Sequence, residues 1–96
     1  MLILRTLAGG PQHGWGISRW LQAASHEVLR VHQGSLYPAL HRLERQGVGR
    51  AEWLPSEFNR RAKYYSLTPV GRRRLEAEAK DWSRFVEAVH FVMQAG

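Results

Sequence analysis

Cysteine is missing from the 96-residue sequence, which excludes disulfide bonds, thiolate metal sites and a cysteine nucleophile. Long hydrophobic runs are missing too, since the longest unbroken one, residues 1–4, has only four residues. We therefore expect neither a membrane-spanning helix nor the core of a signal peptide, and we expect a cytoplasmic protein without a membrane partner. A chain this short predicts one domain with no second module.

The residue types that catalysis needs are scarce or poorly placed. Asp81 is the only aspartate, and no serine lies in the strand-to-helix turn of a nucleophile elbow. We expect no strand before the glycines of residues 9–16, so they do not form a phosphate-binding loop. The histidines lack the spacing of zinc ligands; they are His13, His26, His32, His41 and His90. We expect no enzyme, no metal and no cofactor.

The sequence does have an unevenly placed positive charge. Its formal net charge is +6, and residues 42–74 hold nine Lys and Arg against three acidic residues. A local basic field raises the concentration of polyanions near it and speeds their capture. The alternative, which charge alone does not separate from this, is an ordinary solvated surface that is rich in arginine.

Two helices are expected before residue 25. The first spans residues 1–8 and ends at the breaker Gly9-Gly10-Pro11. The second spans residues 14–24, where apolar residues recur at helical spacing, and we expect its Trp15 and Trp20 to be core aromatics. The inward positions of the first helix are Leu2, Ile3 and Leu7. A short strand is expected at residues 28–31.

A third helix is expected at residues 35–46. Ser35 is a suitable N-cap, Pro38 falls in the first turn, and Gly47 ends the helix. One apolar stripe is formed by Leu36, Leu40 and Leu43. The opposite face carries Tyr37, Pro38, His41, Arg42 and Arg45. A helix that only fills a core does not need such a polar face.

The rest of the chain predicts a hairpin followed by a long helix. Residues 50–54 and 63–67 alternate as strands do, and the polar segment 55–62 joins them as a long basic loop. Thr68 and Pro69 then supply an N-cap and a first helical residue. This order of elements predicts a mainly α fold with a small β-hairpin (α+β), namely a winged helix-turn-helix over residues 1–68.

We expect residues 69–96 to form a dimerisation helix. A helix of about 25 residues spans nearly 40 Å, which is too long for a domain this small to cover. A heptad seam runs along it, so a second copy of the chain should cover that seam. The seam residues, including two that widen it, are Leu75, Ala79, Trp82, Phe85, Val86, Val89, Val92 and Met93.

The geometry of a winged helix-turn-helix predicts which residues meet DNA. The helix of residues 35–46 would enter the major groove, with its N-terminal residues nearest the bases. The hairpin tip would reach phosphates or the minor groove. The expected contacts are Gln33, Ser35, Tyr37, Pro38, His41, Arg42, Arg45, Arg60, Arg61 and Lys63. The alternative to DNA contact is that these side chains only pack against the fold or are solvated.

Three motifs strengthen this interpretation by resemblance. They are His13-Gly14-Trp15-Gly16-Ile17, Gly34-Ser35-Leu36-Tyr37-Pro38-Ala39-Leu40-His41-Arg42-Leu43, and Asn59-Arg60-Arg61-Ala62-Lys63-Tyr64-Tyr65-Ser66-Leu67-Thr68. In order and spacing they resemble the PadR-like family of bacterial transcriptional regulators. Three positions depart from the family pattern: Trp15 stands where tyrosine is usual, Phe58 where asparagine is usual, and Gly49 where a larger apolar residue often starts the first wing strand.

The resemblance implies a winged-helix DNA-binding domain, a homodimer built through the last helix, and repression at a palindromic promoter site. It implies that Ser35, Tyr37 and Pro38 begin the recognition helix. It also implies that the basic residues of the third motif lie near the DNA backbone; these are Arg60, Arg61 and Lys63.

The sequence thus predicts a homodimeric, sequence-specific binder of double-stranded DNA that represses transcription from a pseudo-palindromic operator. The alternative is a winged-helix protein-interaction module that docks through its long helix, with the basic face serving an acidic partner. A small-molecule effector is not evident. Trp82 and Phe85 form either an aromatic pocket at the dimer axis or part of a packed seam.

Overall fold

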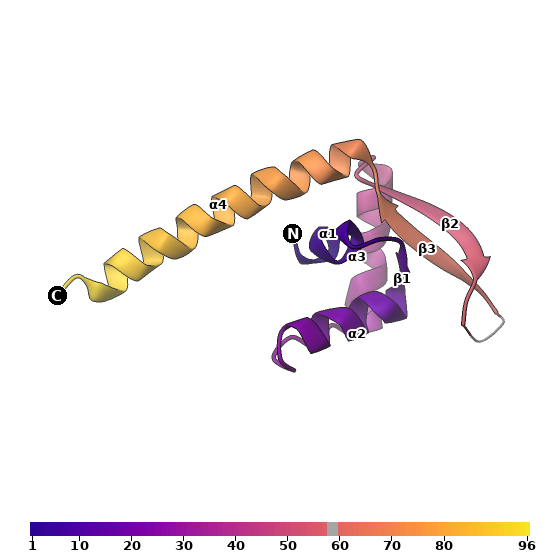
Figure 1. Cartoon of the computed structure of the whole chain (residues 1–96), viewed down its shortest axis with the longest axis horizontal. Coiled ribbons are helices and arrows are strands. Elements are labelled where there is room, and N and C mark those ends of the chain that lie inside the picture. The colour runs from indigo at the N-terminus through magenta and orange to yellow at the C-terminus, as the bar shows by residue number, and fades with distance from the viewer. Residues whose placement is uncertain (58–59) are drawn as a thin grey trace.

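A computed structural model of the protein describes residues 1–57 and 60–96 (Figure 1). In those residues a small helical body packs against a β-hairpin, and one long helix leaves the body as an arm. The elements are α1 (Leu2–Ala8), β1 (Gln12–His13), α2 (Gly14–Ala24), α3 (Gln33–Arg45), β2 (Gly49–Pro55), β3 (Arg61–Leu67) and α4 (Pro69–Gln94). This is the α+β winged-helix fold that the sequence predicts.

The hairpin of β2 and β3 is antiparallel, and β1 adds a short strand on the other side of β3. Ala51 pairs with Tyr65, and Trp53 pairs with Lys63. Because side chains alternate between the two faces of a strand, these four residues share one face. We call it the inner face, since Tyr65 is buried in the core beside α3.

The strands extend further than the sequence predicts, so the loop between them is shorter. β2 reaches Pro55 and β3 begins at Arg61, and the backbone N–H of Ser56 donates to the carbonyl oxygen of Arg60 at 2.6 Å. The loop was expected over residues 55–62. The motif residue Asn59 and its neighbour Phe58 lie outside the described residues.

The core lies where α1, α2 and α3 meet the sheet. Its buried cluster consists of Leu7, Ile17, Leu21, Leu36, Leu40 and Tyr65. Leu36 and Leu40 lie on the stripe predicted for the third helix, and they are at most 1% exposed. In α1 the inward residue Leu4 was not predicted, whereas Leu2, which was, is exposed.

The prediction that Trp15 and Trp20 are core aromatics is wrong. Their side chains are 44% and 40% exposed, and Ile17 and Leu21 fill the buried face of α2 instead. Each ring lies under an arginine: Arg19 is 4.6 Å from the centroid of Trp15, and Arg5 is 5.7 Å from that of Trp20. A guanidinium over an aromatic face stabilises the ring at the surface. The buried stripe of α2 is therefore narrower than the spacing of its apolar residues predicts.

Two further expectations between α2 and α3 are wrong. Residues 28–31, all of them described, form coil rather than a strand. The third helix begins at Gln33 rather than at residue 35, and its N-cap is His32, not Ser35. The carbonyl oxygen of His32 accepts hydrogen bonds from the backbone N–H groups of Ser35 and Leu36, which starts the helix earlier. The helix ends at Arg45, one residue before the predicted end.

A joint of hydrogen bonds connects the end of α3 to the start of α4. The hydroxyl of Thr68 donates to the carbonyl oxygen of Gly47 at 2.6 Å and accepts from the N–H of Gly71 at 3.1 Å, as its predicted role of N-cap requires. Arg74 donates to Gln46 and also to Glu78. The second hydrogen bond lowers the pKa of the Glu78 carboxyl. Gly47 has a φ of +74°, which glycine adopts without strain.

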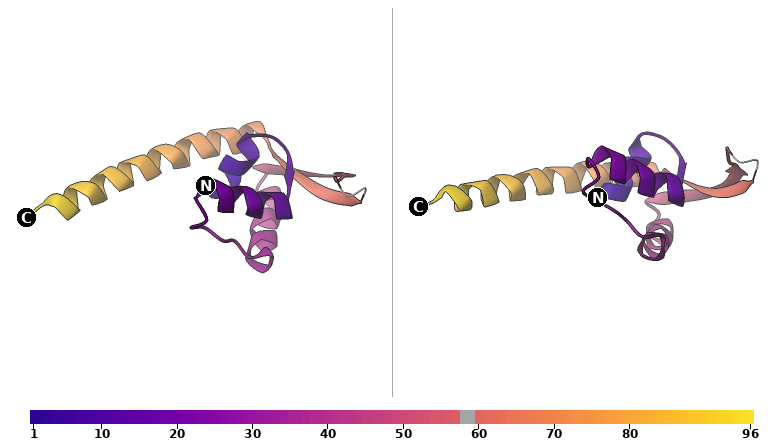
Figure 2. Two further views of the ribbon diagram at one scale, coloured as in Figure 1. Left: turned by 60° about the horizontal axis from the view of Figure 1, so that its bottom comes forward. Right: turned by 90° about the horizontal axis from the view of Figure 1, so that it is seen from below.

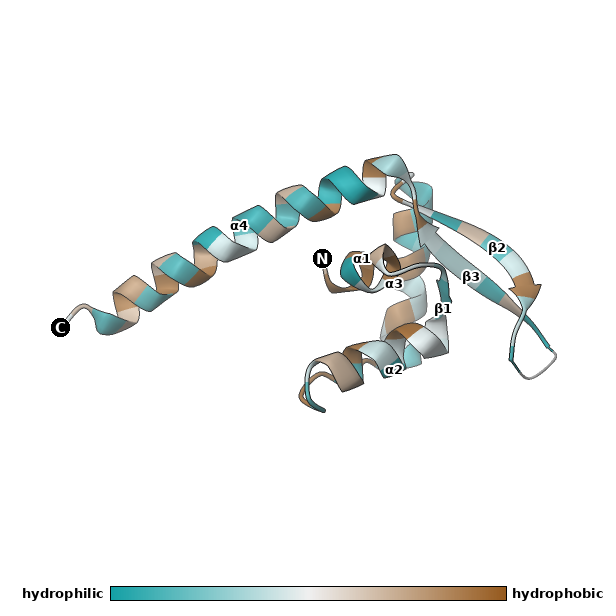
Figure 3. Ribbon diagram, in the orientation of Figure 1, coloured by the Kyte–Doolittle hydropathy of each residue, from teal (hydrophilic) through white to brown (hydrophobic). Residues whose placement is uncertain are grey.

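The arm gives the chain an elongated shape, visible from three directions (Figures 1 and 2). The radius of gyration is 15.5 Å and the extents are 57 × 29 × 21 Å, whereas a compact domain of this length has a radius near 13 Å. The 26 residues of α4 span about 39 Å. Hydrophobic residues recur along α4 to its far end (Figure 3).

Gly71 tests the joint. A Cβ added there would collide with the backbone carbonyl oxygen of Val48, and backbone cannot rotate away as a side chain can. We expect Gly71→Ala to lower the free energy of unfolding by about 2–4 kcal/mol in urea denaturation. Gly34→Ala is the matched control, because that Cβ would meet nothing within 4 Å and alanine favours helix. Equal stabilities of the two variants would contradict the close approach at Gly71.

Candidate functional site

The candidate site begins with the exposed face of α3. Leu36 and Leu40 are buried on one side of the helix, and Tyr37 and Pro38 between them are exposed to solvent. Tyr37 is 49% exposed, although it is a large aromatic residue. Five other predicted site residues are exposed on this helix: Ser35, Pro38, His41, Arg42 and Arg45. The rotation of α3 therefore matches the prediction.

Gln33 differs from the other predicted contacts. It is half-buried, and its side-chain amide donates to the hydroxyl of Ser18 on α2 at 3.0 Å. That hydroxyl in turn donates to the carbonyl oxygen of Val31 at 3.2 Å. Gln33 thus fastens the first turn of α3 to α2, which fixes where the exposed face of α3 begins.

The start of α2 makes room for Tyr37. The ring nitrogen Nδ1 of His13 caps α2 by accepting from the N–H of Gly16 at 3.0 Å. A Cβ on Gly14 would lie 2.9 Å from the Tyr37 ring and hydroxyl, and one on Gly16 would collide with the Gln12 side chain. The two glycines of the first motif therefore permit close packing that a larger residue would block.

The hairpin places basic residues beside α3. Lys63 lies 3.5 Å from the carboxylate of Glu44 on α3, and its ammonium group is 5.6 Å from the centroid of the Tyr65 ring. This ion pair connects β3 to α3, and Tyr65 of β3 belongs to the same buried cluster as Leu36 and Leu40 of α3. Arg60 and Arg61 are exposed at the described end of the hairpin.

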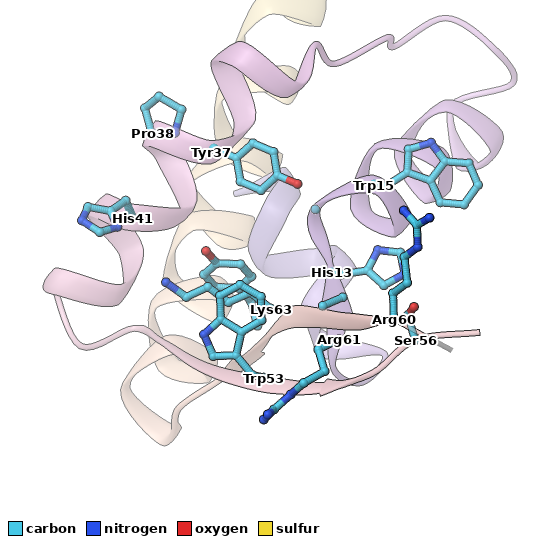
Figure 4. A pocket seen from close by; sticks show the side chains of 13 residues that line it. His13, Trp15, Tyr37, Pro38, His41, Trp53, Ser56, Arg60, Arg61 and Lys63 are labelled. Carbon is cyan, nitrogen blue, oxygen red and sulfur yellow. The ribbon is translucent and has the colours of Figure 1, made fainter. Parts of the chain in front are cut away.

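A cleft of about 950 Å³ lies between α3 and the hairpin (Figure 4). It brings together six of the predicted site residues, while the predicted residues Gln33, Ser35, Arg42 and Arg45 lie outside it. The six are Tyr37, Pro38, His41, Arg60, Arg61 and Lys63. In Figure 4 the guanidinium of Arg60 extends toward Trp15 and His13, whereas that of Arg61 points away from them.

Sequence analysis missed Trp53 as a site residue. Its side chain lines the cleft from β2 and is 57% exposed. The register of the hairpin, which the sequence did not predict, places Trp53 opposite the basic residue Lys63 on one face. Trp15, expected in the core, also lines this cleft.

A second surface runs along α4. Gly71 is buried and Leu75 and Glu78 are half-buried where the helix leaves the body. The predicted seam residues beyond them are exposed in the single chain: Ala79, Trp82, Phe85, Val86, Val89, Val92 and Met93. The rings of Trp82 and Phe85 contact each other with centroids 5.8 Å apart.

Within residues 1–57 and 60–96, no group of three or more His, Asp or Glu side chains could hold a metal ion. In the same residues no helix is long and apolar enough to cross a membrane.

The profile of the transcriptional regulator PadR-like family matches residues 3–77. The chain belongs to this family. A transcriptional regulator of Mycobacterium tuberculosis is 37% identical over 79 residues, which cover 81% of this chain and 69% of that protein. The crystal structure of a PadR family transcription regulator from Clostridium difficile superposes with a TM-score of 0.77 at 28% identity, covering 96% of this chain and 93% of that one.

A further relative is an uncharacterized 37.1 kDa protein of a Streptomyces fradiae transposon. It is 42% identical over 84 residues, which cover 88% of this chain. This PadR-like chain corresponds to only 23% of the length of that protein.

Gly14 tests the packing of the PadR-like site. Gly14→Ala places a methyl group against the Tyr37 ring, and we expect a loss of about 1 kcal/mol in the free energy of unfolding. In a Tyr37→Ala background the collision is gone, and the same change should be neutral or stabilising because alanine favours helix. Urea denaturation of the four proteins in this double-mutant cycle measures the difference. Additive effects would show that the two residues do not touch.

Proposed function

We propose that this PadR-like chain is a homodimeric, sequence-specific binder of double-stranded DNA that represses transcription from a pseudo-palindromic operator. The observation that supports this best is the position of the exposed face of α3 beside the basic end of the hairpin. The B-DNA major groove admits one α-helix, and a second basic element beside that helix can reach the flanking backbone. Occupation of a promoter by such a dimer would block transcription.

The contacts divide by position. Ser35 and Tyr37 lie in the N-terminal half of α3, which is nearest the bases in a recognition helix, with Pro38 and His41 following. Arg42 and Arg45 lie in the last turn, where they would meet phosphates at the edge of the groove. The hairpin would contact the backbone or the minor groove through Arg60, Arg61 and Lys63. Residues 1–68 are then the DNA-binding domain.

The homodimer would form through residues 69–96. The exposed seam of α4 continues the stripe that Gly71 and Leu75 begin against the body, so one side of the helix is apolar over its whole length. Val86 and Val89 are its less exposed members, at 46% and 42%, and Met93 is 80% exposed near the end. A second copy supplies the same apolar stripe, which is what a two-fold interface requires.

Tyr37 tests sequence readout. Tyr37→Ala removes a side chain that is assigned to base contact, so binding to the cognate operator should fall by about tenfold or more. Binding to random duplex should change little. Gel shifts or fluorescence anisotropy on the two DNAs measure the ratio of their affinities. The cognate site comes from selection of bound sequences with the wild-type protein.

Arg61→Ala is the matched contrast to Tyr37→Ala. It removes a phosphate contact, so we expect weaker binding on both DNAs. The plot of the log association constant against log salt concentration should become less steep by about one unit. An unchanged salt slope would show that Arg61 does not contact a DNA phosphate. If Tyr37→Ala lowered the affinity for both DNAs equally, Tyr37 would not read the base sequence.

Val89 tests the dimer. Val89→Asp places a carboxylate in the apolar seam, where burying an unpaired charge costs several kcal/mol. Sedimentation at micromolar concentration should show a dimer for the wild type and a monomer for the variant, with weaker DNA binding. Ala77→Asp adds the same charge to an exposed position on the other side of α4 and should leave the dimer intact. A monomeric wild type would refute the role of the arm.

A further inference from the structure

Trp53 is a large aromatic residue of β2 that is exposed to solvent. It lies on the inner face with Ala51, Lys63 and Tyr65. Along this face burial falls from Tyr65, which is 4% exposed, to Trp53, which is 57% exposed. Trp53 therefore lies on the part of the inner face that extends beyond the core. Its side chain lines the cleft on the side opposite α3 (Figure 4).

The chemistry of the cleft is aromatic and cationic. Three partly exposed rings come from three different elements: Trp15 on α2, Tyr37 on α3 and Trp53 on β2. Lys63 and the two arginines of the hairpin end also line the cleft. Among its described lining residues none is acidic. An occupant should thus offer apolar surface and negative charge side by side.

We propose that the cleft holds the sugar–phosphate backbone of one DNA strand, and that Trp53 packs on its deoxyribose rings. The inference rests on the proposed function. With α3 in the major groove and the hairpin end toward the neighbouring minor groove, the strand that separates these grooves must pass between them. That is where the cleft lies. Deoxyribose supplies apolar surface for the exposed ring of Trp53, and the phosphates supply negative charge for the three basic residues.

The exposure of the rings favours a strand over a small molecule. Trp15, Tyr37 and Trp53 are 44%, 49% and 57% exposed, so the cleft is a trough open to solvent. A small ligand would stay partly in water there, whereas a duplex docked on α3 would cover the trough and exclude water from the rings. The apolar contact would then form only in the DNA complex.

This assignment gives Trp53 a signature that differs from those of Tyr37 and Arg61. Sugar contacts carry no sequence information, so Trp53→Ala should weaken binding to operator and random duplex alike, by about tenfold. The variant loses no cation, so the slope of log K against log salt should not change. Trp53→Phe keeps a ring and should recover most of the affinity.

Hydroxyl-radical footprinting reports the contact directly, since the radicals attack deoxyribose. At saturating protein, the wild type should protect a short run of sugars beside each half-site, and Trp53→Ala should lose that run while keeping protection elsewhere. Trp20→Ala is the matched control: this tryptophan is 40% exposed on α2 but does not line the cleft. It should leave affinity and footprint unchanged.

Three outcomes would overturn the inference. Trp53→Ala binding within about twofold of the wild type, with an intact footprint, would show that no strand rests on this ring. A loss confined to the operator would make Trp53 a base-reading residue instead. Normal DNA binding by Trp53→Ala, together with tryptophan quenching by small planar aromatics that the wild type shows and Trp53→Ala loses, would assign the cleft to such ligands. A wild type that binds no duplex would instead refute the proposed function itself.

Discussion

The burial of Leu36 and Leu40 determines what the rest of the molecule can do. These two side chains are at most 1% exposed, and their spacing of one helical turn fixes the rotation of α3 about its axis. With that rotation fixed, Tyr37 and His41 must face outward beside the hairpin. Each buried leucine contributes about 2–3 kcal/mol, so a rotated helix that exposed both would be unstable. The exposed face is thus held in place by residues that never meet a ligand.

The joint at Thr68 connects this helix to the arm. Gly47 follows the end of α3, and its carbonyl oxygen accepts a hydrogen bond from the hydroxyl of Thr68, the residue that caps α4. Arg74 of α4 adds a hydrogen bond to Gln46. In a dimer built through α4, the separation of the two copies of α3 would depend on this short connection. A half-site spacing of about 34–36 Å would then be set at the joint as much as at the interface.

Sequence reasoning succeeded where residues close together in the sequence decide the local structure. The leucine stripe of α3 and the Thr68-Pro69 start of α4 are local signals, and the structure confirms both. It failed where tertiary contacts decide. β1 has only two residues and exists because Gln12 and His13 pair with β3. Trp15 looked like a core residue by spacing, but an arginine one turn later covers its ring at the surface.

The exposed seam of α4 and the exposed cleft have a common cause. With so few residues the chain buries only a small core, so apolar side chains remain on the α4 seam and around the cleft. If Trp53 packs on a DNA strand, the cleft is covered only in the complex, whereas the seam is covered in the free dimer. A protein with dimeric arms would then present two clefts at a fixed distance. Any change that loosens the joint should weaken binding to paired half-sites more than binding to a single one, because only the paired site requires that distance.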